Sequence, residues 1–82
     1  MTFAVWLRSR FPTEQSASAL RRLMSAAGCP VATVTAWSWL AGQRRPSATH
    51  LEVLLDALEV TGAARDIAYR LHREAGMRGR QA

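Results

Sequence analysis

The chain has 82 residues, of which 49% are hydrophobic and 21% are charged, so it is long enough for one small folded domain. Its single cysteine, Cys29, excludes an intrachain disulfide, and two widely separated histidines, His50 and His72, exclude a four-ligand zinc site. All eleven basic residues are arginines, and against six acidic residues they give a net charge of +5. Such an excess on a small domain is typical of proteins that bind a polyanion, most often nucleic acid.

The charge is unevenly distributed along the chain. Residues 1–45 hold six arginines against Glu14 alone, for a net +5. Residues 46–64 hold three acidic residues and no basic one, and residues 65–82 hold five arginines against two acidic residues. We therefore expect one part of the molecule to be acidic and to face away from a polyanion.

A run of 21 positions without charge, residues 23–43, has the length of a membrane span. It contains Pro30, two glycines and five hydroxyl or amide side chains, which are costly in hydrocarbon, so we expect no membrane insertion. The arginines near the N-terminus follow the short apolar stretch there and do not precede it, so no signal peptide is expected. The prediction is a cytoplasmic protein.

Helical spacing of apolar residues predicts two helices in the first third of the chain. Thr2 is placed to cap the first helix, which Pro12 closes, and Thr13 is placed to cap the second, which Gly28 ends. The apolar positions are Phe3, Trp6, Leu7 and Phe11 in the first helix and Ala17, Leu20, Leu23, Met24 and Ala27 in the second.

Three further helices are predicted in the rest of the chain. The third covers roughly residues 32–41 and ends at Gly42. Residues 49–52 have the spacing of a capping box and open a leucine-rich fourth helix. Thr61 is placed to cap a fifth helix that stops at Gly76, which leaves residues 77–82 as a basic flexible tail. No alternation of period two competes, so the predicted fold class is all-α, a compact five-helix domain over residues 1–76.

The second and third helices, joined by a turn that contains Gly28, have the pattern of a helix-turn-helix. In that motif the second helix enters the major groove of DNA, where short hydrogen-bonding and methyl-bearing side chains suit the base edges. The hydroxyls of residues 33–38 fit this role. An ordinary buried helix, whose hydroxyls bond back to its own main chain, is an open alternative.

The segment Val31–Gly42, followed by Gln43-Arg44-Arg45-Pro46-Ser47 and Leu51, resembles the DNA-binding domain of Cro/C1-type (lambda-repressor-like, XRE) regulators. The resemblance covers roughly residues 12–60 and implies a lambda-repressor-like five-helix fold. Within it, the third helix would read bases while arginines of the second helix and of the following loop contact phosphates. The candidate DNA-binding residues are Arg22, Thr33, Val34, Thr35, Trp37, Ser38, Gln43, Arg44 and Arg45.

The resemblance admits two registers for the third helix. Counting forward from Gly28 makes Trp37 the core tryptophan, whereas counting back from Gly42 makes Trp39 the core residue and requires a longer turn. We favour the longer turn because the match after the helix is continuous and Pro30 fits a turn better than a helix. This register directs four side chains toward the groove. They are Thr33, Val34, Trp37 and Ser38.

The predicted function is sequence-specific binding of double-stranded DNA by a transcriptional regulator, of the phage or mobile-element repressor type. The resemblance implies a homodimer on an inverted-repeat operator. Because DNA would occupy the third helix, we expect the fifth helix or the Trp6/Phe11 region to form the dimer contact. We expect no enzyme activity, cofactor, metal or small-molecule ligand, because no catalytic or phosphate-loop motif occurs. The alternatives are a helical, antitoxin-like protein-interaction adaptor with a basic surface, and a DNA-binding protein without sequence preference.

Overall fold

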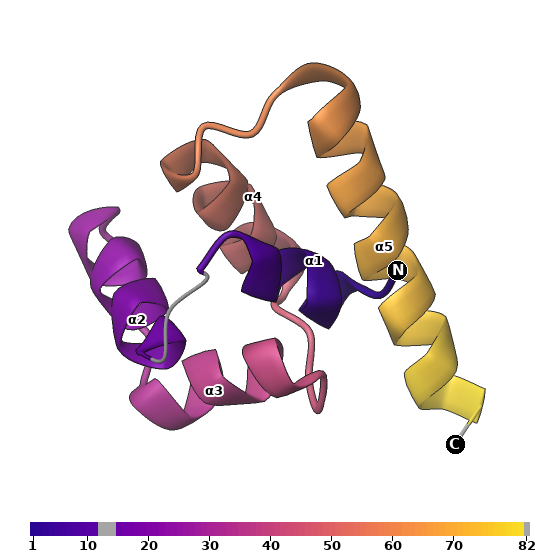
Figure 1. Ribbon diagram of the computed structural model, residues 1–82, viewed down its shortest axis with the longest axis horizontal. Coiled ribbons are helices and arrows are strands. Elements are labelled where there is room, and N and C mark those ends of the chain that lie inside the picture. The colour runs from indigo at the N-terminus through magenta and orange to yellow at the C-terminus, as the bar shows by residue number, and fades with distance from the viewer. Residues whose placement is uncertain (12–14, 82) are drawn as a thin grey trace.

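The computed structural model describes residues 1–11 and 15–81 of the chain. These residues form five helices, which are α1 (Phe3–Ser9), α2 (Ser16–Ala26), α3 (Thr33–Ala41), α4 (Ala48–Ala57) and α5 (Gly62–Gln81) (Figure 1). No strand occurs in this part of the chain. The radius of gyration of 11.8 Å is that of a compact domain of this length. The prediction of a compact all-α fold with five helices is confirmed.

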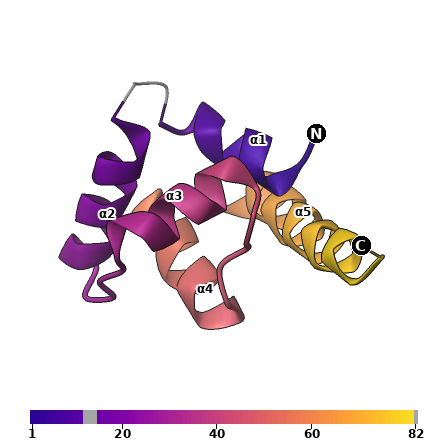
Figure 2. The same ribbon diagram turned by 90° about the horizontal axis from the view of Figure 1, so that it is seen from below.

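The helices form one cluster in which α1 occupies the middle. The longest helix, α5, forms one end of the molecule and α2 the other (Figure 1). Helix α3 packs against α2 and α1, while α1 also packs against α5 and α2 against α4. Seen from below, α3 lies on the surface nearest the viewer (Figure 2).

The core draws large apolar side chains from every helix, among them that of Trp6 from α1. Burying these side chains supplies most of the driving force for folding, since α1 to α4, with 7 to 11 residues each, are too short to be stable alone. The buried core consists of Phe3, Trp6, Leu7, Leu20, Met24, Ala36, Trp39, Leu40, Leu51, Leu54, Leu55, Val60, Ala68 and Leu71.

The first helix begins as its sequence predicts. The backbone N–H of Val5 donates to the Thr2 hydroxyl at 3.2 Å, so Thr2 caps α1. The helix ends at Ser9, and the predicted stop Pro12 and cap Thr13 lie outside the described residues.

The predicted capping box of α4 is wrong. Helix α4 begins at Ala48, and its cap is Ser47, whose hydroxyl accepts from the N–H of His50 at 3.2 Å. Ser47 has extended backbone angles directly before the helix, which is the conformation that lets a hydroxyl reach the N–H three residues on. Thr49 is already inside the first turn, so its hydroxyl does not have that geometry.

The predicted end of α5 at Gly76 is also wrong, because the helix continues to Gln81. A Cβ atom at Gly76 would lie 2.4 Å from Cζ of Arg45. Gly76 therefore leaves space beside α5 for the guanidinium of Arg45, and it does not end the helix. Residues 77–81 of the predicted tail are helical.

None of the helices in residues 1–11 and 15–81 combines the length and the apolar character that crossing a bilayer requires.

Candidate nucleic-acid interface

Residues 27–32 connect α2 to α3, a turn longer than the usual three or four residues. Gly28 has φ +82°, a left-handed conformation that glycine adopts without strain, and the N–H of Cys29 donates to the carbonyl of Met24 at 2.9 Å. The chain then runs through Pro30 to the first residue of α3, Thr33. The longer turn that the preferred register requires is therefore present.

The two tryptophans of α3 lie on opposite sides of the helix. Trp39 is 3% exposed and packs in the core, whereas Trp37 is 51% exposed. Two residues correspond to about 200° around a helix, so the pair cannot share a face. Trp39 is therefore the core tryptophan, as the favoured register requires.

The first turns of α3 present a solvent-exposed surface formed by Thr33, Val34 and Trp37, which we call the α3 face. Val34 is 69% exposed, an unusual exposure for a valine, and lies one helical turn from Trp37. Thr35 is half-buried at the edge of this surface. The prediction that these residues lie outside the core is confirmed for the α3 face.

Ser38 does not belong to the α3 face, and its predicted place toward the groove is wrong. Its side chain is buried, and the hydroxyl donates to the carbonyl of Val34 at 2.9 Å. The loop after α3 folds back over this position, where the N–H groups of Gln43 and Arg44 donate to the Ser38 carbonyl at 3.0 and 3.3 Å. For this residue the alternative of a hydroxyl bonded to its own helix is correct.

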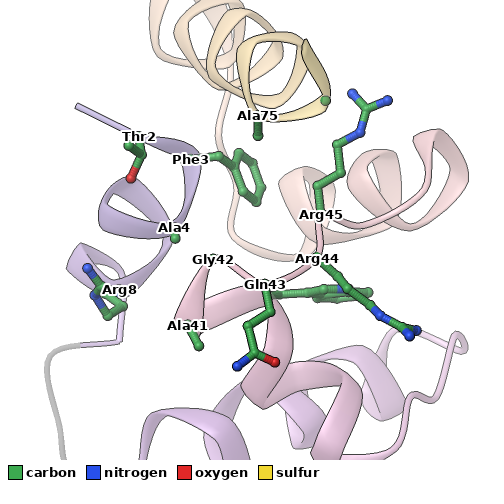
Figure 3. Close-up of a pocket in the computed structure, with 12 residues that line it drawn as sticks. Thr2, Phe3, Ala4, Arg8, Ala41, Gly42, Gln43, Arg44, Arg45 and Ala75 are labelled. Carbon is green, nitrogen blue, oxygen red and sulfur yellow. The ribbon is translucent and has the colours of Figure 1, made fainter. Parts of the chain in front are cut away.

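The two arginines of the α3–α4 loop point in different directions (Figure 3). Arg44 extends into solvent, whereas Arg45 turns toward α5, where its Nη1 atom donates to the carbonyl of His72 at 2.9 Å. The buried His72 ring is itself held by a 2.6 Å hydrogen bond between Nε2 and the Pro46 carbonyl. Arg45 therefore links the loop to α5 through Gly76 and His72, a contact that the sequence prediction did not include.

Arg8, which the sequence prediction did not select, holds the far end of α3. Its Nη1 atom donates to the carbonyl of Leu40 at 2.7 Å. A cation at the C-terminus of a helix stabilises the unpaired carbonyls there. The two partners are 32 residues apart in the chain, so no local pattern could have revealed the contact.

A cleft of about 650 Å³ lies between α1, the α3–α4 loop and α5 (Figure 3). Its walls include Phe3, Ala75 and three arginines, which are Arg8, Arg44 and Arg45. The predicted Gln43 is exposed and lines the same cleft. Gln43 and Arg44 thus follow the C-terminal end of α3, while Thr33 and Val34 stand at its beginning.

Arg22 is exposed on α2, as is its neighbour Arg21. Among the described residues, no carboxylate lies within ion-pair distance of Arg22 or Arg44. Both guanidinium groups therefore keep their full charge toward solvent.

Every acidic side chain that the structure describes belongs to α4, α5 or the turn between them. Arg65 pairs with Glu52 at 2.7 Å and with Asp56 at 2.9 Å. The Tyr69 hydroxyl donates to Glu52, and this bond, followed by the one from Arg65, lowers the pKa of that carboxyl below its ordinary 4.5. The acidic segment predicted from the sequence is thus partly neutralised by α5. The charged residues of α1 and α2 are all arginines, and α3 carries no charged residue.

The two residues of one region predicted for dimerisation differ in exposure. Trp6 is buried and cannot form a dimer contact, whereas Phe11 is only partly buried, so a dimer contact at Phe11 or on α5 stays a prediction. The sequence placed both on one helical stripe but could not show that the stripe faces the centre of the cluster. On α5, Ile67 and Met77 are exposed.

Comparison of the chain with protein-family models, with curated proteins and with solved structures finds no match. The resemblance to Cro/C1-type regulators therefore stays a prediction from the residues quoted above. In the described part of the chain, no three His, Cys, Asp or Glu side chains are close enough together to hold a metal ion.

Proposed function

We propose that this chain is a sequence-specific, double-stranded DNA-binding transcriptional regulator in which α3 enters the major groove. The observation that carries the proposal is the α3 face, the exposed first part of a helix, together with the exposed Arg22 and Arg44, for which the described residues provide no carboxylate partner. The major groove accommodates one helix, and helix-turn-helix proteins place the N-terminal residues of that helix against the bases. Helix α3 follows α2 after a glycine-containing turn, which supports this docking.

Arg22 and Arg44 would contact phosphates on the two sides of the groove. Each is exposed, and neither has a described carboxylate partner, so each can neutralise a phosphate without breaking an ion pair. Such contacts fix the register of a protein on the duplex and supply affinity that falls with salt. The acidic residues of α4 and α5 would then lie away from the duplex.

Transcription would be regulated by occlusion of a promoter, with arginines holding the DNA backbone while α3 reads the bases. The family resemblance implies a homodimer on an inverted repeat. A single module of this size makes few base contacts, so a second copy would supply the specificity that one copy lacks.

Selection of bound duplexes from a random pool tests the proposal directly. We expect a two-fold symmetric consensus, and binding to random DNA that weakens steeply with salt. The variant Arg44→Ala should reduce affinity for all sequences alike and lower the salt slope by about one. The matched control is Arg70→Ala, which removes an exposed arginine from α5 and should change neither.

The same experiment separates the alternatives. A protein-interaction adaptor would use the exposed Val34 and Trp37 against another protein and would show no salt-dependent binding to DNA. A DNA-binding protein without sequence preference would show the salt dependence but yield no consensus.

A further inference from the structure

We infer that α3 recognises its sites through the methyl groups of thymine in the major groove, an inference that rests on the proposed function. The inference rests on the residue types at the start of α3. Val34 and Trp37 lie there beside Thr33 and Thr35, and none of these side chains is both long and polar.

The chemistry of α3 limits what it can read. Between Thr33 and Ala41 the helix contains no Arg, Lys, Asn, Gln, Asp or Glu. Guanine and adenine are usually identified by paired hydrogen bonds from Arg, Lys, Asn or Gln, and cytosine by a carboxylate. None of these contacts can come from α3.

The side chains that are present suit one base-edge group. Val34 and Trp37 offer apolar surface to solvent, being 69% and 51% exposed, and Thr33 adds a methyl beside its hydroxyl. The C5-methyl of thymine is the apolar group on the major-groove edge, and apolar side chains read it by contact. Ser38, whose hydroxyl could have bonded a base, is already bonded to the Val34 carbonyl.

Other polar groups stand too far along the helix to replace this contact. Gln43 and Arg44 follow the C-terminal end of α3, whose nine residues span about 13 Å. They can add contacts beside the α3 face but cannot occupy the place of Val34. The base pairs under Val34 and Trp37 are therefore identified by methyl contact.

The charge around the α3 face favours DNA over protein as the partner of this apolar surface. Helices α1 and α2 contain arginines and no acidic residue, and α3 contains no charged residue. A partner for exposed apolar groups beside arginines should be negatively charged and should carry apolar groups of its own. DNA has both features, because its phosphates are negative and its major groove carries the thymine methyls.

The test uses the full chain and a duplex selected from a random pool. Replacing thymine by deoxyuridine at each position in turn removes the C5-methyl and leaves the hydrogen-bonding edge intact. We expect binding to weaken about fourfold for each contacted methyl, the effect of losing one buried methyl-sized group. Changing a contacted T·A pair to C·G should abolish the preference, and 5-methylcytosine at that position should restore part of it.

A protein variant makes the test specific to α3. In Val34→Ala, substitution by deoxyuridine at the position under Val34 should cost less than in the native protein, whereas the matched control Val5→Ala, an exposed valine on α1, should behave like the native protein. Val34 is largely exposed, so its truncation leaves the core intact, and the deoxyuridine series on the native protein requires no variant.

The outcomes distinguish the inference from the proposed function. A consensus whose affinity is indifferent to every deoxyuridine substitution overturns the methyl inference and leaves the DNA-binding proposal standing. Absence of salt-dependent DNA binding overturns both. If Val34→Ala leaves DNA affinity unchanged and alters the mass of the protein in sedimentation, the α3 face is a contact between copies of this chain, and the inference is wrong.

Discussion

Replacing Gly76 by alanine should have opposite effects on stability depending on whether Arg45 is present. In an isolated helix the change from glycine to alanine stabilises by about 0.5–1 kcal/mol. Here the new Cβ would lie 2.4 Å from Cζ of Arg45 and 2.6 Å from its Nη1, so the guanidinium must leave its place over α5. With it goes the 2.9 Å hydrogen bond to the His72 carbonyl.

The magnitudes decide the sign. A hydrogen bond from a charged donor contributes about 1.5–3 kcal/mol, and the exposure of Arg45 puts this one at the lower end. Gly76→Ala alone should therefore destabilise by about 0.5–1 kcal/mol, whereas in the Arg45→Ala background it should stabilise by about the same amount. The coupling between the two positions is then about 1.5 kcal/mol.

Urea unfolding of the native protein, the two single variants and the double variant measures all four free energies. A change of about 1 kcal/mol corresponds to roughly 4–8 °C in melting temperature for a domain of this size, so thermal melts give an independent reading. If Gly76→Ala stabilises equally in both backgrounds, Arg45 does not lie on α5, and the account of why α5 passes through a glycine is wrong.

Three further predictions concern the tryptophans, Ser38 and the carboxylate cluster. Trp39→Ala should cost about 3–5 kcal/mol in urea unfolding, whereas Trp37→Ala should change stability by no more than about 0.5 kcal/mol, and equal losses would contradict the assigned faces. Ser38→Ala should leave DNA affinity unchanged in a binding titration, because the hydroxyl is bonded to its own helix, and a tenfold loss would put it back in the groove. Because folding lowers the pKa of Glu52, that group stabilises the fold above its ordinary pKa of 4.5 and loses this effect as the pH falls through the lowered value. The difference in melting temperature between native protein and Tyr69→Phe should therefore be largest near neutral pH and shrink below pH 4.5, and a constant difference throughout would exclude this hydrogen bond as its source.

The helices were predictable because their signals are local. Apolar spacing and a hydroxyl before the first turn depend on neighbouring residues only, which is why α1 starts after Thr2 as expected. The prediction of the α4 cap was wrong because Ser47 and Thr49 both precede a leucine-rich stretch. The sequence does not show which of the two takes extended backbone angles.

The site was predictable only in part, because some of its residues depend on distant partners. The exposure of Val34 and Trp37 follows from helix geometry once Trp39 is in the core. The direction of Arg45 depends on His72, 27 residues later, and no pattern within a dozen residues contains that information. The hydrogen bond of Ser38 is local, since its hydroxyl donates to the Val34 carbonyl four residues earlier, and the sequence left this alternative open. The role of Gly76 could not be predicted either, because it depends on the guanidinium of Arg45 from the α3–α4 loop.

The attachment of α3 to α1 affects the rate and the affinity with which α3 can bind a ligand. Arg8 donates to the Leu40 carbonyl at the end of α3, and at the following Gly42 an added Cβ would lie 3.3 Å from that of Ala4, so the two helices are in close contact. A segment fixed in this way is already ordered before any partner arrives and surrenders little conformational freedom when it docks. Removing the Arg8 hydrogen bond, for example by Arg8→Ala, would leave the residues of the α3 face unchanged. Helix α3 would then be less ordered before binding, and its affinity for a ligand would fall.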